Sequence, residues 1–107
     1  MATTPKSEIL HLAELVNYQE GSVVSRQITK ADTGNVTLFA FDRDQELSEH
    51  TAPFDALVHV LDGSAEIKIS GQAFHLETGD AIVMPANEPH ALKAPVPFKM
   101  LLTMIRN

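Results

Sequence analysis

The stretch "ALVHVLDGSAEIKIS", from Ala56 to Ser70, alternates apolar and polar residues on both sides of an Asp-Gly pair. Alternation of this kind is typical of half-buried strands, and Asp-Gly favours a two-residue turn in which both residues have positive φ. Counting outward from this turn pairs Leu61 with Ser64 and gives the hairpin two different faces. The apolar face, which we expect in the core, consists of Ala56, Val58, Val60, Ala65, Ile67 and Ile69. The sequence therefore predicts a tight β-hairpin in which Val58, Val60, Ile67 and Ile69 are buried.

The opposite face of this hairpin carries His59, Glu66, Lys68 and Ser70, together with Leu57 and Leu61. His59 is expected to point away from the core and to pair across the strands with Glu66. Two leucines on a polar face form an apolar patch, and such patches often mark a contact between subunits. We therefore predict a homodimer that covers part of the Leu57, His59 and Leu61 face. The alternative, that single surface leucines carry no meaning, stays open.

The rest of the chain repeats this pattern of short strands and turns. Between the turn signals lie runs rich in valine, isoleucine, phenylalanine and threonine, such as "VTLFAF" and "FKMLLTMI". The turn signals are Glu20-Gly21, Thr33-Gly34-Asn35, Asp62-Gly63, Ser70-Gly71 and Thr78-Gly79. Short strands at regular spacing indicate an all-β sandwich or barrel. We expect one domain over residues 1–107, with residues 1–7 as a loose end, and "SEILHLAELV" as either a helical turn or a strand.

Composition excludes several kinds of function. The chain has no cysteine, so thiolate metal sites and thiol nucleophiles are absent and any metal must be held by nitrogen and oxygen. The net charge is −6 and the eight Lys and Arg residues are scattered, which gives no basic stripe for nucleic acid. No apolar run is long enough for a membrane helix, and the start "MATTPKSEIL" lacks the apolar core of a secretory signal. We therefore expect a cytoplasmic protein with neither nucleic-acid nor membrane partners.

A second stretch, "GDAIVMPANEPHAL" from Gly79 to Leu92, resembles the second sequence motif of the cupin superfamily. Gly79, Pro85, Asn87 and His90 stand at the motif spacing, with Asn87 where the family usually has glycine. The end of "LSEHTAPFDALVHVLDG" resembles the end of the first cupin motif, and the likeness covers Phe39 to Met104. The resemblance implies a small cupin-type jelly-roll β-barrel.

The resemblance also implies where metal ligands would lie. Carried over onto this sequence, the first motif places its two histidines at Ser48 and His50 and its glutamate at Ala56, while the second motif supplies His90. Only His50 and His90 keep a ligand side chain, and two imidazoles alone make a weak site for a divalent transition metal. Strand alternation puts Glu46 on the same side as Ser48 and His50, so Glu46 is the first candidate for a third ligand.

Asp55 is a second candidate acid, because a bulge could bring it to the position that the family's glutamate takes. We expect His50 and His90 to approach each other at one mouth of the barrel. Either they hold a metal ion, or they form a hydrogen-bonded pair with no ion.

The expected binding pocket contains Ser48, His50, His90 and Met100. Met100 belongs to a final strand in which methionines alternate, a pattern that suits an adaptable cavity but also plain filling of the core. The function that we predict is a small-molecule-binding barrel with a degenerate metal site, a function that does not require catalysis. The alternative is a metal-dependent enzyme of the dioxygenase or isomerase type that uses His50 and His90.

Overall fold

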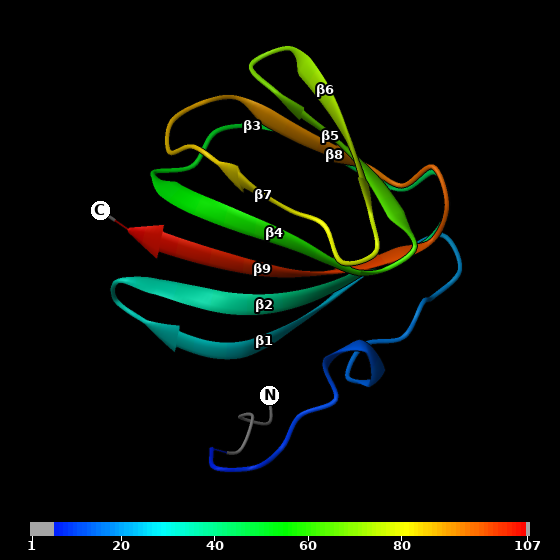
Figure 1. Ribbon diagram of the computed structural model, residues 1–107, viewed down its shortest axis with the longest axis vertical. Helices are drawn as coiled ribbons and strands as arrows, with labels where there is room; N and C mark the ends of the chain where they lie inside the picture. Colours follow the sequence, from blue (N-terminus) through cyan, green and yellow to red (C-terminus); the bar gives the residue numbers. More distant parts are fainter. Residues whose placement is uncertain (1–5, 107) are drawn as a thin grey trace.

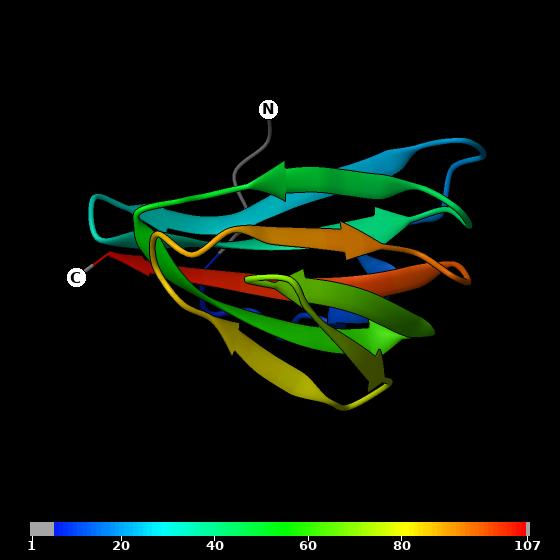
Figure 2. The same ribbon diagram turned by 90° about the horizontal axis from the view of Figure 1, so that it is seen from above.

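The computed structural model describes residues 6–106, which form two antiparallel sheets that face each other (Figure 1, Figure 2). The five-stranded sheet has the order β1 (Val23–Ala31), β2 (Gly34–Phe41), β9 (Phe98–Arg106), β4 (Phe54–Asp62) and β7 (Ala81–Met84). The four-stranded sheet has the order β3 (Glu46–His50), β8 (His90–Lys93), β5 (Ser64–Ile69) and β6 (Gln72–Glu77). The all-β jelly-roll prediction is confirmed.

The predicted hairpin at Asp62-Gly63 is wrong. Strand β4 pairs with β7 and β9, whereas β5 pairs with β6 and β8, so the chain passes from one sheet to the other at Gly63. Gly63 has a φ of +74°, but Asp62 does not adopt a positive φ. A Cβ at Gly63 would lie 2.1 Å from the carbonyl oxygen of Pro97, so the corner needs glycine for close approach as well.

The tight hairpin lies instead at Ser70-Gly71, where both residues have positive φ, 48° and 84°. Ile69 and Gln72 face each other across this turn. The predicted burial is correct for Val58, Val60 and Ile67, which are fully buried, whereas Ile69 is half-buried. The prediction of burial is correct although the predicted strand pairing is wrong, because β4 and β5 turn their apolar faces toward the same core from opposite sheets.

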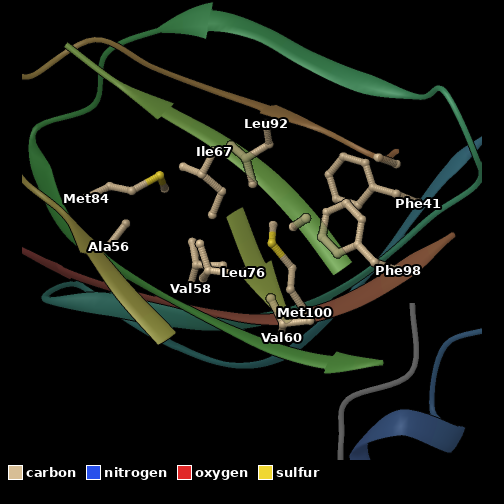
Figure 3. Packing of buried hydrophobic residues seen from close by; sticks show 12 residues of the cluster. Phe41, Ala56, Val58, Val60, Ile67, Leu76, Met84, Leu92, Phe98 and Met100 are labelled. Atoms are coloured by element: carbon tan, nitrogen blue, oxygen red, sulfur yellow. The ribbon is translucent and has the colours of Figure 1, made fainter. Parts of the chain in front are cut away.

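The main core fills the space between the two sheets (Figure 3). Phe41 and Phe98 stack with ring centroids 4.5 Å apart, and Figure 3 shows them toward one end of the core. Ala56 and Met84 lie toward the other end, at the left of the same view. Burial of each large apolar side chain contributes roughly 1.5–3 kcal/mol to folding.

A second apolar cluster lies on the outer face of the five-stranded sheet and is covered by the N-terminal segment. This segment contains one short 3-10 helix, η1 (Leu12–Glu14), and its Val16 is buried. Leu61 packs in this cluster, so the chain itself covers part of the face that we expected at a dimer contact. Its members are Val16, Leu38, Ala40, Leu12, Leu15, Val24, Ile28, Leu61 and Leu101.

Polar contacts hold the N-terminal segment in place. Lys99 Nζ donates a hydrogen bond to the carbonyl oxygen of Ala13 at 2.6 Å and lies 5.0 Å from the centre of the Tyr18 ring. The Tyr18 hydroxyl donates to the Asp62 carboxylate at 2.5 Å. Burial, followed by the contact with this carboxylate, raises the pKa of Tyr18. The segment is therefore tied to both β9 and the end of β4.

The start of the chain was expected to be loose over residues 1–7, and residues 1–5 lie outside those that the structure describes. Within residues 6–106, no helix has the length and apolar character to cross a membrane.

Candidate functional site

His50 and His90 meet where β3 ends and β8 begins. The two residues are register partners, and their Nε2 atoms lie 3.1 Å apart. Their rings are 4.3 Å apart between centroids and inclined by 72°. His90 is only 4% exposed, whereas His50 is exposed. The prediction that the two imidazoles approach each other is confirmed.

Backbone carbonyl groups determine which nitrogen of each ring carries a proton. His50 Nδ1 lies 2.7 Å from the Ser48 carbonyl oxygen, and His90 Nδ1 lies 3.2 Å from that of Glu88. A carbonyl oxygen only accepts, so each Nδ1 must donate its hydrogen. With both Nδ1 atoms donating, the 3.1 Å contact between the Nε2 atoms is a hydrogen bond only when one ring carries a second proton, and two neutral rings turn their lone pairs toward each other there. The pair is therefore suited to a cation or to a ligand that donates hydrogen bonds.

The burial of His90 favours the neutral ring. Burial lowers the pKa of His90 below its usual value; the carbonyl of Glu88 opposes this effect and the neighbouring His50 adds to it. A neutral imidazole is the form that binds metals and accepts hydrogen bonds.

The loop from Pro85 to Pro89, which carries His90 into the site, is tied down at both ends. The Asp55 carboxylate accepts a hydrogen bond from the Ala86 N–H at 2.9 Å, and the Ala52 carbonyl accepts one from the Asn87 N–H at 2.8 Å. Asn87 has a φ of 65°, a left-handed conformation that suits glycine or asparagine. Asp55 therefore anchors this loop, which is a different role from the ligand role that we considered for it.

The far end of the loop is held by Ser70, in the tight β5–β6 turn. Its N–H donates to the Pro89 carbonyl and its hydroxyl donates to the Glu88 carboxylate, both at 2.8 Å. Because the Glu88 carbonyl accepts from His90 Nδ1, these bonds orient the imidazole. Sequence reasoning missed Ser70 and Glu88; the Ser-Gly turn signal marked the place but not the contact.

Glu46 does not lie with the histidines, contrary to our expectation. Between Leu47 and His50 the strand advances three residues while its partner advances two, from Leu92 to His90, which is a β-bulge. The bulge reverses the alternation, so His50 shares the inward side with Leu47 and Glu46 faces outward opposite Lys93.

Glu46 and Ser48 line a different hollow, on the four-stranded sheet. This groove of about 270 Å³ also contains Glu66, Lys68 and Lys93. The structure therefore brings only the carbonyl group of Ser48, and no part of Glu46, into the contacts of the histidine pair.

Met100 does not line the opening either. It is fully buried opposite Val60 and Phe39, in the middle of the core, so filling the core accounts for it. Ala56, where the resemblance places a glutamate, is also buried, and its register partners on either side are Met84 and Met104.

A divalent metal centre with three or four ligands does not fit these residues. Within the part of the chain that the structure describes, no three residues among His, Cys, Asp and Glu are grouped so that they could hold an ion. A transition ion bound through imidazoles generally needs at least three protein ligands. His50 and His90 are therefore a ligand pair without the carboxylate that would complete it.

Comparison with known proteins agrees with this architecture. A family model described as "Cupin domain" matches residues 37–105. A conserved protein of unknown function from Streptococcus pyogenes is 34% identical, with a TM-score of 0.91 and coverage of 100% of this chain and 96% of that one. A cupin superfamily protein from Desulfitobacterium hafniense is 29% identical, with a TM-score of 0.91 and coverage of 99% and 97%.

A cupin 2 conserved barrel domain protein from Leptotrichia buccalis is 40% identical over 91% of this chain, with a TM-score of 0.88. The present chain spans 47% of that protein's length. No curated protein matches the sequence. From the two facing sheets, the motif around His90 and the matching family model, we conclude that this chain belongs to the cupin family.

Proposed function

We propose that this cupin is a binding barrel that holds a small ligand at the His50–His90 opening and does not catalyse a reaction. The observation that carries the proposal is the 3.1 Å approach of the two Nε2 atoms, with both Nδ1 atoms engaged by backbone carbonyls. Two adjacent acceptors, one buried and one exposed, suit a ligand that enters from solvent and donates hydrogen bonds or carries positive charge.

The alternative function is a metal-dependent enzyme of the dioxygenase or isomerase type. The close approach of two imidazole Nε2 atoms favours it, because imidazole nitrogen is a common metal ligand. Such chemistry needs an ion that keeps open positions while the protein holds it firmly, usually through three ligands. Glu46 faces the outer groove and Ala56 has no donor atom, so the set lacks the carboxylate that this function requires.

Metal analysis and ring NMR separate these functions. In protein purified without an affinity tag, we expect Mn, Fe, Co, Ni and Zn well below one equivalent. In a screen of small alcohols, phenols and amines, we expect binders to shift the ring signals of His50 and His90. A stoichiometric divalent ion that is lost in His90→Ala would establish the metal alternative.

The matched control for this experiment is His75→Ala. His75 is exposed on β6 and contacts Glu77 at 2.7 Å, away from the site, so its replacement should change neither result. If no member of the screen moves the His50 and His90 signals, the binding proposal is wrong.

The proposal extends to a homodimer in the cytoplasm, formed through the part of the outer sheet face that the N-terminal segment leaves open. Leu57, Val83 and Ile105 are 39%, 53% and 55% exposed there. Leu57 and Val83 are register partners, and Asp55, two residues from Leu57, pairs with Ile105. Support for a partner comes from these three exposed apolar side chains on one sheet face, because exposed apolar patches often mark subunit contacts.

A further inference from the structure

We propose that a second site, separate from the His50–His90 opening, lies between the N-terminal segment and the edge strand β1 and binds a small organic carboxylate with an apolar body. Arg26 pairs with the carboxylate group, while Leu15, Val16 and Val24 contact the apolar body. The site belongs to the outer face of the five-stranded sheet, so it does not depend on the proposed function.

A groove of about 620 Å³ lies where the N-terminal segment passes β1. Two stretches of chain form its walls, residues 15–19 of the segment and residues 24–26 of the strand. Pockets for small molecules usually have volumes of about 300–1,000 Å³. The groove is therefore large enough for a small organic ligand.

The inner part of the groove is apolar. Val24 packs in the outer apolar cluster, where its register partner Ala40 is fully buried. Leu15 packs in the same cluster, and Val16 is only 3% exposed. Contact with these side chains removes the apolar part of a ligand from water, which favours binding.

Arg26 contributes the one formal charge among the described residues that line the groove. It follows Val24 by two positions on β1, and its register partner is the buried Leu38. Strand alternation therefore places Arg26 and Val24 on the same, outer side of the sheet. A ligand that contacts Val24 can thus reach the guanidinium.

The guanidinium of Arg26 has no partner within residues 6–106, where it makes neither a hydrogen bond nor an ion pair. Its side chain is half-buried, and a charge removed from water without a partner is unfavourable. The chain has 14 acidic residues against eight Lys and Arg, yet no described acidic residue pairs with Arg26. An anion that enters the groove supplies the missing partner.

Contacts on either side of residues 15–19 hold this wall of the groove in place. Lys99 Nζ donates a hydrogen bond to the Ala13 carbonyl oxygen at 2.6 Å, and the Gly21 N–H donates to the Asp42 carboxylate at 2.7 Å. A wall that is already ordered loses little conformational entropy when a ligand binds.

The pairing of an apolar surface with one guanidinium selects the class of ligand. A carboxylate matches the fork of N–H groups that a guanidinium presents. An inorganic anion would gain nothing from Leu15, Val16 and Val24, and an uncharged apolar molecule would leave Arg26 unpaired. A monocarboxylate with an aliphatic or aromatic body satisfies both parts of the groove.

Tyr18 allows binding to be measured directly, because it lines the groove and is the one tyrosine of a chain without tryptophan. The test is a titration of the full chain with octanoate, 1-octanol and acetate, followed by tyrosine fluorescence. We expect a saturable change with octanoate, binding of 1-octanol that is about tenfold weaker, and no response to acetate at the same concentrations. Nuclear Overhauser effects should connect the octanoate chain with the methyl groups of Leu15 and Val24.

Arg26→Met removes the charge and keeps an unbranched apolar stem, so it should bind octanoate about tenfold more weakly and 1-octanol as the wild type does. Arg43→Met is the matched control, because it changes the net charge equally at an exposed position between β2 and β3, outside the groove. Thermal unfolding checks that both variants fold. If Arg26→Met does not fold, the comparison of octanoate with 1-octanol in the wild type and the Overhauser contacts decide.

Octanoate that neither changes Tyr18 emission nor contacts Leu15 and Val24 would overturn the site. Equal affinity for octanoate and 1-octanol, full affinity in Arg26→Met, or an equal loss in Arg43→Met would overturn the role of Arg26. His90→Ala should bind octanoate as the wild type does, and loss of octanoate binding in this variant would place the carboxylate at the histidine pair and contradict the inference. Failure of the screen at His50 and His90 would instead overturn the proposed function alone.

Discussion

At the scale of single residues, His90 links the stability of the barrel to pH. Its pKa is lowered in the folded protein, chiefly by burial, whereas the unfolded chain keeps the ordinary value of about 6.5. Between these two values the unfolded state binds more protons, so stability should fall as the pH drops below about 6.5 and through the lowered pKa, and His90 adds no pH dependence above that range. Urea unfolding at about pH 7.5 and about pH 5 should show a larger loss for the wild type than for His90→Gln. The exposed His75→Gln should behave as the wild type does, and equal losses in all three proteins would contradict this account.

At the scale of elements, the corner between β4 and β5 depends on Gly63. Gly63→Ala adds a Cβ 2.1 Å from the Pro97 carbonyl oxygen at a φ of +74°, so the strands on both sides must shift. We expect a loss of about 2 kcal/mol or more in the free energy of unfolding, measured with urea. Gly71→Ala is the control, because Gly71 has a φ of +84° with nothing within 4 Å and should lose only about 1–2 kcal/mol of left-handed strain. A loss at Gly63 no larger than at Gly71 would show that close approach to Pro97 does not matter.

At the scale of the whole molecule, the open half of the outer sheet face should determine the oligomeric state. Val83→Lys places a charge at the centre of the Leu57, Val83 and Ile105 patch, on an edge strand where the side chain is 53% exposed and folding tolerates it. Light scattering at high protein concentration should report a dimer for the wild type and a monomer for this variant. Ile9→Lys is the control, since Ile9 is 88% exposed but belongs to the N-terminal segment, outside the patch. A monomeric wild type would rule out the dimer.

Sequence alone determined which residues enter the core and which loop carries His90. The alternation around Val58, Val60 and Ile67 is a local property of each strand, so it predicts burial whichever strand lies alongside. The motif from Gly79 to His90 is equally local, and together with the resemblance it led to the meeting of His50 and His90 that the structure confirms.

Only the tertiary structure decided how these strands pair and which side chains join the site. An Asp-Gly pair suits either a hairpin or a corner between sheets, and the choice depends on β9 and β8, which lie far along the chain. The bulge after Leu47 places His50 and Glu46 on opposite sides of the strand, because β3 must match the register of β8. The sequence of β3 alone contains no pattern that predicts this bulge. The cover over Leu61 likewise comes from residues more than forty positions away. Contacts between distant segments follow from the packing of the complete core, whereas strand character and burial follow from neighbouring residues alone.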